Sequence, residues 1–571
     1  MHLSGVLDIE RLKLTPDKVA GLATFGLQIE PSARISVSYA TGRCSIDVGP
    51  LDEERGRLPL ASISREKSHF ILSVPAYSFL TLYVIRVGEK LYWSTNIGAL
   101  AADVGVSQPN TKYERFGLKY QFWPGTETIF SGISKIIPGQ RMIIKISGQQ
   151  IEPVSLPDTE VLELDPEDGV AVQRAIHETL LGAVEQLSPP NQIMGVMLGG
   201  FDSALIVALL AELGRPVHAV TLEYDADKYN QRNISQVVER FGIRHDWVHI
   251  DGDLIRDGLY HYGELFDQPV TQPHYLISGL QLARTLADKG VSRALTGDGC
   301  DGLFFGYPTV FRKAKLVRTL HNLPDLIKRM LRRFLSTRSV EHLAGQPARL
   351  ARQLLETTCR PDHLHFFLTA IAVDNESAEF ALRGETMSAS FEDSILDTLY
   401  QTTVAGKDWV DTTYISKNMV GLNRVKLASI WNHSGLDKIH SPYMMPSVTA
   451  MAKAIPKSYW LSDETPSGKF LLARMAIEHG LLSKEIVYQK KMSPVSSPAD
   501  YWLRHDLRSD VEVMLAESSL LNSEYCNDLM RKRWLEEWYK RKVTIDDYAC
   551  QALCMLLSYS RMVGRSPGRD E

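Results

Sequence analysis

Short runs of alternating apolar and polar residues occupy much of the first 157 residues. Examples are residues 70–74 (FILSV) and 80–87 (LTLYVIRV). Because successive side chains of a strand point to opposite faces, both runs predict β-strands with one buried face. Few stretches here have the spacing of a helix. The pattern therefore favours a sandwich of β-sheets in this part of the chain.

From about residue 170, helical and strand-like patterns alternate. Residues 171–186 have helical spacing, whereas 194–198 and 217–223 are short apolar runs typical of buried strands. This order predicts a parallel sheet covered by helices. Residues 310–415 predict further helices. The second half of the chain is therefore expected to be an α/β domain with helical additions.

A polar, acidic, proline-bearing segment separates these two patterns and predicts a linker over residues 158–170. We expect a two-domain α/β protein, with domains at residues 1–157 and 171–571. At 571 residues the chain is long enough for two complete cores.

A glycine-rich turn follows the predicted strand at 194–198 and leads into an apolar helical run. It carries Gly199, Gly200, Asp202 and Ser203. Glycines let backbone N–H groups approach a phosphate closely, and a helix N-terminus favours negative charge. A neighbouring carboxylate can hold Mg²⁺, and a serine can donate a hydroxyl. On its own, such a turn is also a common connection between a strand and a helix, without any binding function.

A second turn of this kind lies about a hundred residues later, where a short apolar run ends at Leu295. It carries Gly297, Asp298 and Asp301. Because open α/β sheets bind ligands at the carboxyl ends of their parallel strands, we expect both turns to face one crevice. The pair indicates a nucleotide-binding site.

With three further segments, the turns resemble the synthetase half of the asparagine synthetase family. That family reads S-G-G-x-D-S and S-G-[DE]-G-x-D-E-L-F-G-G-Y where this chain has LGGFDS and TGDGCDGLFFGY. Residues 266–270 (FDQPV), 467–472 (SGKFLL) and 489–492 (QKKM) resemble its F-D-E-P, G-K-x-L-L and R-P-K-x-G-F segments. The resemblance implies an adenine nucleotide α-hydrolase-like (PP-loop) parallel-sheet domain, preceded by an Ntn-hydrolase-like αββα sandwich.

The resemblance also implies a nucleotide-binding set for ATP. It comprises Leu198, Gly199, Gly200, Asp202, Ser203, Leu222, Gly297, Lys469 and Lys491. Asp202 and Asp301 would hold Mg²⁺, and the two lysines would offset charge on the departing pyrophosphate. Adenine and ribose would rest near Leu198 and Leu222. Leu198 stands where the family has a serine, so one hydroxyl near the phosphates is missing.

Asp298 and Lys491 are the candidate catalytic residues. Amide formation needs a base because an ammonium group cannot attack an acyl-adenylate, and Asp298 occupies the acidic position of the second turn. β-Lactam synthetases carry a tyrosine at that position. The alternative is that Asp298 only orders the turn or a magnesium-bound water.

His2 stands where the glutamine-dependent members have the cysteine that becomes their amino-terminal nucleophile. The opening MHLSGVLD otherwise resembles theirs, so we expect an inactive glutaminase fold. Two branches with the same defect are β-lactam synthetases and lasso peptide cyclases, which activate a carboxylate as an acyl-adenylate and let an internal amine attack.

These resemblances predict an ATP-dependent ligase that releases AMP and pyrophosphate and forms an amide within its substrate, most simply a lasso peptide macrolactam synthetase. The alternatives are a β-lactam-type or other small-molecule amide synthetase, an ammonia-dependent asparagine synthetase, and a catalytically silent scaffold. The substrate would be a peptide or small-molecule carboxylate. The lasso branch adds a leader-peptide-binding protein and a cysteine protease as partners.

Charge and composition argue against several classes of binding partner. A net charge of −5 argues against a nucleic-acid partner, and no apolar run approaches the roughly 20 residues that span a bilayer. No targeting signal is evident, so we expect a cytoplasmic protein without a membrane partner. The six cysteines show neither disulfide nor zinc spacing, and no metal is expected beyond Mg²⁺.

Overall fold

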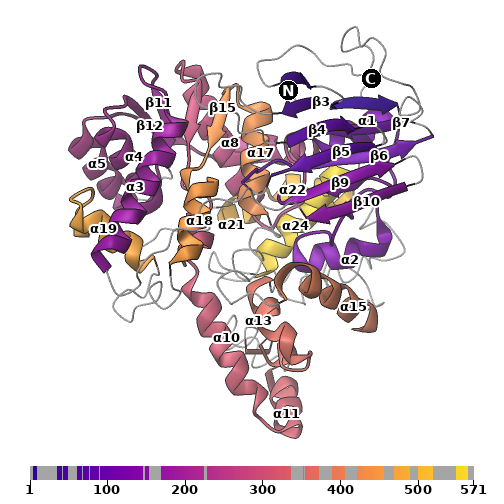
Figure 1. Cartoon of the computed structure of the whole chain (residues 1–571). Coiled ribbons are helices and arrows are strands. Elements are labelled where there is room, and N and C mark those ends of the chain that lie inside the picture. Colours follow the sequence, from indigo (N-terminus) through magenta and orange to yellow (C-terminus); the bar gives the residue numbers. More distant parts are fainter. Residues whose placement is uncertain are drawn as a thin grey trace.

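The computed structural model describes the greater part of the chain (Figure 1). The described residues are 4–8, 35–40, 43–48, 61–66, 69–75, 77–88, 90–145, 148–153, 169–223, 228–335, 351–352, 354–371, 389–405, 421–455, 469–488, 499–517 and 548–563.

Two antiparallel sheets form the first part of the chain. One has the order β1-β7-β6-β8, the other β10-β9-β5-β4-β3-β2. Their strands are β1 (Ser4–Asp8), β2 (Ile35–Ala40), β3 (Arg43–Val48), β4 (Ala61–Glu66), β5 (His69–Val74), β6 (Leu82–Val87), β7 (Lys90–Ser94), β8 (Ser134–Ile136), β9 (Gln140–Lys145) and β10 (Gly148–Pro153). The strands predicted at 70–74 and 80–87 are β5 and β6, the second starting two residues later than expected.

The inner faces of these sheets share one apolar core. Leu72 of β5, Trp93 of β7 and Met142 of β9 are all fully buried within it. Helix α1 (Ile97–Val104) packs on β6 and β7, and α2 (Thr111–Tyr120) follows it. Among the described residues, α1 thus covers the smaller sheet, and no helix of the expected second layer is seen on the larger one.

A five-stranded sheet, entirely parallel, forms the second part in the order β13-β12-β11-β14-β15. Its strands are β11 (Met194–Met197), β12 (Val217–Glu223), β13 (Arg244–His249), β14 (Arg293–Leu295) and β15 (Lys438–His440). All four residues of β11 are buried, as expected for a central strand with covered faces. The parallel sheet predicted from the sequence is confirmed.

Helices cover both faces of the parallel sheet. Val196 and Leu295 face a core formed with α3, α4, α18 and α19, whereas Met197 and Ala294 face the core that contains α8 and α17. The helices of this part are α3 (Gly169–Leu187), α4 (Phe201–Glu212), α5 (Lys228–Phe241), α6 (Gly252–Tyr260), α7 (Tyr262–Leu265), α8 (Pro273–Asp288), α9 (Cys300–Leu303), α17 (Leu422–His433), η4 (Pro442–Met444), α18 (Pro446–Ala454), α19 (Phe470–Glu478), α20 (Lys484–Val487), α21 (Ala499–Arg504), α22 (Arg508–Ala516) and α24 (Tyr548–Val563).

The two parts are joined through a continuous core. The core of the antiparallel sheets runs on into α6, α8, α17 and α24 without a break. A buried polar network crosses the same junction: Arg424 donates to Thr81 (2.6 Å) and to Asp267 (3.0 Å), and the Tyr83 hydroxyl donates to Asp267 (2.9 Å). The FDQP segment therefore serves this junction.

A helical arm projects from the body (Figure 1). It contains α10 (Pro308–His321), α11 (Asp325–Leu335), α13 (Asp362–Ile371), α15 (Ala389–Leu399) and the π-helical turn η3 (Tyr400–Val404). A small core that includes Phe116, Phe367 and Leu396 fastens α13 and α15 to α2. Glu392 of α15 accepts hydrogen bonds from Lys119 and Tyr120 of α2. The helices predicted over 310–415 are confirmed for the described residues.

Helix α3 begins at Gly169, so the last two residues of the predicted linker are helical, and residues 158–168 lie outside the described part. Across the described residues, no helix is long and apolar enough to cross a membrane.

Candidate active site

The two glycine-rich turns lie against each other, because β11 and β14 are neighbouring parallel strands. A Cβ placed on Gly297 would lie 2.9 Å from Cβ of Asp202. Any side chain at Gly297 would therefore push the turns apart. The expected adjacency of the two turns is present, and Gly297 serves it by close packing.

A buried lysine joins the acids of the two turns. The ammonium group of Lys469 lies 2.5 Å and 2.7 Å from the two carboxylate oxygens of Asp202, and 2.5 Å from Oδ1 of Asp301. Lys469 is 8% exposed. Burial opposes its charge, but the neighbouring carboxylates outweigh this and hold the pKa of Lys469 well above its ordinary value. Three of the predicted site residues thus form one cluster.

The backbone at Lys469 is held in an uncommon conformation. Its φ is 58°, in the left-handed region that non-glycine residues seldom adopt, and it immediately precedes α19. Such a conformation costs of order 1–3 kcal/mol and persists only where surrounding contacts enforce it. The ion pairs with Asp202 and Asp301 are contacts of that kind, and they offset the strain at Lys469.

The first turn is preorganised by Ser203. Its hydroxyl accepts hydrogen bonds from the N–H groups of Gly199 (2.9 Å) and Gly200 (3.2 Å) and donates to the Gly200 carbonyl (3.1 Å). Within the described part of the chain, a Cβ on either glycine would meet no atom within 4 Å. Gly200 is extended, with φ of 179°, so its backbone also tolerates other residues. Packing among the described residues therefore does not require glycine at either position.

Tyr443 and Gly306 support the two acids. The Tyr443 hydroxyl donates to the backbone carbonyl of Asp202 at 2.8 Å. A Cβ on Gly306 would lie 2.0 Å from Oδ1 of Asp301, so only glycine leaves room for that carboxylate. Burial raises the pKa of Tyr443 well above its ordinary value, which keeps its hydroxyl protonated as a donor.

Leu198 directly follows β11 before the first turn, and Leu222 lies near the end of β12. Leu198 is buried; its N–H donates to the Val220 carbonyl (2.9 Å), and its own carbonyl accepts from the Thr221 hydroxyl (2.7 Å). Both backbone groups of Leu198 are thus used within the protein, while Leu222 is partly buried against the core. An adenine contact at these two residues stays a prediction.

Asp298 belongs to a second cluster. Its carboxylate pairs with Lys426 (2.7 and 2.8 Å) and accepts from the Thr296 hydroxyl (2.7 Å) and, at 3.4 Å, from Tyr275. Lys426 also donates to the Tyr275 hydroxyl at 2.8 Å. A carboxylate has about four lone-pair directions, and these contacts occupy them. The geometry favours the alternative that Asp298 orders the turn, and its role as a base stays a prediction.

Burial opposes the charge of Lys426 as well, but Asp298 and Tyr275 outweigh it and raise the pKa of Lys426 above its ordinary value. Burial raises the pKa of Tyr275 to about 12. Near neutral pH Lys426 is therefore an ammonium group and Tyr275 a neutral phenol.

Sequence reasoning missed Lys426, Tyr275 and Tyr443. Lys426 lies 128 residues from Asp298 along the chain, within α17, and Tyr275 lies within α8. Both helices carry several other polar residues, so no local signal singles out either side chain. Two predicted positions, His2 and the catalytic candidate Lys491, lie outside the described residues.

The donor set at the first cluster fits magnesium and a polyphosphate. Asp202 and Asp301 offer carboxylate oxygens, which Mg²⁺ prefers, and Lys469 already occupies the space between them as a cation. One ammonium group against two carboxylates leaves a net charge of −1, which a divalent cation can reverse.

The family described as Asparagine synthase matches residues 175–557, which is more than half of the chain. The chain belongs to the asparagine synthase family. It is accordingly an ATP-dependent carbon–nitrogen ligase, as the sequence predicts.

Curated relatives are distant. "Asparagine synthetase [glutamine-hydrolyzing] 1" of Bacillus subtilis (strain 168) is 21% identical over 454 residues, covering 76% of this chain and 67% of that protein. "Amidase chyE" of Penicillium rubens is 22% identical over 298 residues, covering 48% of this chain and 43% of that protein. The chain spans about two thirds of the first relative and less than half of the second.

Among solved structures, a glutamine phosphoribosylpyrophosphate amidotransferase from B. subtilis complexed with ADP and GMP covers 41% of this chain and 47% of its own, with 14% identity and a TM-score of 0.11. A likeness this low carries no argument about fold or function.

Proposed function

We propose that this protein adenylates a carboxylate of its substrate and then closes an amide with an amine of the same substrate, most simply as a lasso peptide macrolactam synthetase. AMP and pyrophosphate are the co-products. The observation that carries the proposal is Lys469 between Asp202 and Asp301, where two turns and a distant helix bring together the charges that a triphosphate needs.

In the first half-reaction, a carboxylate oxygen of the substrate attacks the α-phosphorus of ATP, and the bond to pyrophosphate breaks. Asp202 and Asp301 would hold Mg²⁺, which supplies neutralising charge on the phosphates. Lys469 adds fixed positive charge beside them. The space beside Gly199 and Gly200 leaves room for a phosphate, and their N–H groups, which now donate to the Ser203 hydroxyl, would turn to it when ATP binds.

In the second half-reaction, the amine attacks the acyl carbon, the bond to AMP breaks and the amine loses a proton. Asp298 is the proposed acceptor of that proton, provided that it releases one of the hydrogen bonds from Lys426, Thr296 or Tyr275. Since these donors now occupy its oxygens, the substrate amine must displace one of them on binding. Binding of the amine would thereby free an Asp298 oxygen to accept the proton.

Two sequence features support the proposals that the amine belongs to the substrate and that the substrate is a peptide. His2 stands where glutamine-dependent members have their nucleophilic cysteine, so the amine comes from elsewhere. Asp298 stands where β-lactam synthetases have a tyrosine, which counts against a β-lactam product. The leader-peptide-binding protein and the cysteine protease remain proposed partners.

The test incubates the purified chain with ATP, Mg²⁺ and a linear candidate precursor peptide, and follows pyrophosphate release and product mass. Cyclisation lowers the peptide mass by one water, whereas amidation with ammonia lowers it by about 1 Da. Asp202→Asn should abolish release, and Asp253→Asn, at an exposed acid of α6, should leave it unchanged. Equal release by the Asp202 variant and the unaltered chain would refute the site, and a complete lack of carboxylate-dependent turnover would favour a silent scaffold.

A further inference from the structure

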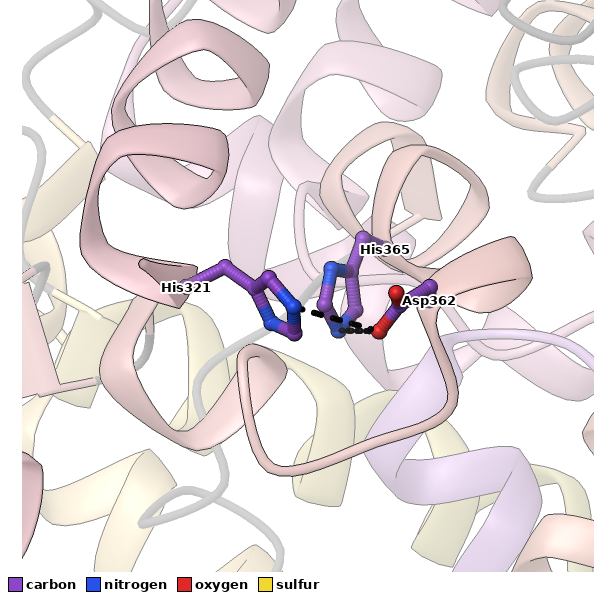
Figure 2. Close-up of side chains that lie close together, drawn as sticks. All are labelled: His321, Asp362 and His365. Atoms are coloured by element: carbon purple, nitrogen blue, oxygen red, sulfur yellow. Dashed lines mark ion pairs between the residues drawn. The ribbon is translucent and has the colours of Figure 1, made fainter. Parts of the chain in front are cut away.

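Two histidines and an aspartate meet in the helical arm, away from both turns. His321 ends α10, and Asp362 and His365 lie in the first turn of α13. Figure 2 shows both imidazole rings directed toward the Asp362 carboxylate. Nε2 of His321 lies 3.5 Å from Oδ1 of Asp362, and Nε2 of His365 lies 4.0 Å from the same oxygen. One potential ligand atom from each residue lies within 4.8 Å of the others.

These spacings are close to those of a metal coordination sphere. Zinc binds imidazole nitrogen and carboxylate oxygen at about 2.0–2.2 Å, so adjacent ligands in a tetrahedron lie about 3.4 Å apart. The separations of 3.5 and 4.0 Å need only a small contraction. Nε2–H of His365 donates to the backbone carbonyl of Arg360 at 2.8 Å, so metal binding by this nitrogen would replace that hydrogen bond. Two imidazoles and one carboxylate suit zinc better than Mg²⁺, which prefers oxygen ligands.

The surroundings of the imidazoles also bear on metal binding. Nδ1 of His321 is buried without a hydrogen-bond partner among the described residues. The nearby charge of Lys328 is offset by Asp325 at 3.4 Å.

We propose that His321, Asp362 and His365 bind one divalent ion of the zinc class, which joins the end of α10 to the start of α13. The site goes beyond the proposed ligase activity and shares no residue with it. Chain segments that diverge after α10 and return at α13 would be fixed to each other at that point. The role is structural, because the ion lies in the arm and not beside the two turns.

The experiment titrates the full-length chain, purified after chelator treatment and without nucleotide, with Co²⁺ as a spectroscopic probe and then with Zn²⁺. Visible absorption of Co²⁺ with a nitrogen-containing, four-coordinate sphere is expected to saturate at one equivalent and to disappear on displacement by Zn²⁺. His321→Ala and His365→Ala should each weaken binding by at least about 100-fold, since even outer partners of metal ligands are worth 10–100-fold. His363→Ala removes a neighbouring histidine that pairs with Asp397, and should leave binding unchanged.

Asp362→Asn tests whether loss of binding reflects a lost ligand or a misfolded chain. The Asp362 side chain is 78% exposed, so its replacement should not disturb folding. It should weaken Co²⁺ binding while leaving the circular dichroism spectrum and the melting temperature of the metal-free chain unchanged. Zn²⁺ should raise the melting temperature of the unaltered chain and not that of the variant. A titration without a saturable site, or one that survives the double change of both histidines, overturns the proposal. Pyrophosphate release plays no part in this readout, so failure here leaves the ligase assignment intact.

Discussion

Two buried lysines lie at the same end of the parallel sheet, and their surroundings differ in charge and in hydrogen bonding. Lys469 contacts two carboxylates, Asp202 and Asp301, whereas Lys426 contacts one, Asp298. The first cluster keeps a net negative charge beside open space at Gly199 and Gly200. The second is neutral, and a tyrosine and a threonine complete its hydrogen bonds. The comparison predicts that the cluster with unbalanced charge binds the ligand, and that the balanced cluster serves the interior of the protein.

The largest expected effect comes from unbalancing the second cluster. Lys426→Met leaves Asp298 buried without its cation, which should lower the free energy of unfolding by about 3–5 kcal/mol. Combining it with Asp298→Asn should restore more than half of that loss, because no unpaired charge remains. Urea unfolding of both variants and of Asp298→Asn alone measures the coupling. If the double variant is as unstable as Lys426→Met, charge balance is not what stabilises this cluster.

Removing the other lysine should damage activity more than folding. Lys469→Ala is expected to slow carboxylate-dependent pyrophosphate release by about 10²–10³-fold, the usual loss when one preorganised charged donor is removed. Because Asp202 and Asp301 then repel each other, millimolar Mg²⁺ should raise the melting temperature of this variant. The same addition should not rescue Lys426→Met. Lys289→Ala, at a half-exposed lysine, serves as the control.

The rates of the two half-reactions in Asp298→Asn distinguish the two possible roles of Asp298, and the expected change is smaller. If its oxygens remain occupied by donors, Asp298→Asn should slow adenylation and amide formation by the same factor of about ten, which corresponds to about 1.4 kcal/mol. Pyrophosphate exchange reports the first half-reaction and product mass the second. A selective loss of amide formation of about 10²–10⁴-fold would instead establish Asp298 as the base and show that the second cluster opens during turnover.

The smallest change removes only a hydroxyl from the second cluster. Tyr275→Phe takes away the 2.8 Å hydrogen bond to Lys426 but keeps the ring, whose centroid lies 4.7 Å from the ammonium group. The expected cost is about 0.5–1.5 kcal/mol of unfolding free energy, measured in urea beside Tyr501→Phe at an exposed tyrosine. A larger cost would mean that the phenol, and not the ion pair, dominates the cluster.

Local pattern was sufficient for the first turn, because a strand, two glycines and an acid lie within nine consecutive residues. The same holds for α3, whose observed bounds differ from the predicted helix by two residues at one end and one at the other. Lys469 was found only through the family resemblance, since it lies 267 residues from Asp202.

Lys426 and the histidine cluster could not be predicted in this way. Lys426 has no acid beside it in sequence, and its partner is supplied by the packing of α17 against α8 and the second turn. Asp362 and His365 have helical spacing, but His321 belongs to another helix. The expectation of no metal beyond Mg²⁺ followed from sequence spacing alone, which does not reveal ligands brought together by folding. Adenine binding at Leu198 and Leu222 and catalysis by Lys491 remain predictions.

The junction between the antiparallel sheets and the parallel sheet has a consequence for how this chain can change. Thr81 and Tyr83 hold Arg424 and Asp267 from the other side of that junction, within a core common to both parts. A chain shortened to begin after residue 157 would expose to water the Arg424 guanidinium group and the apolar surfaces of α6, α8, α17 and α24 that share the core of the sheets. The amino-terminal sheets are therefore expected to be needed to cover this core, whether or not they retain chemistry of their own.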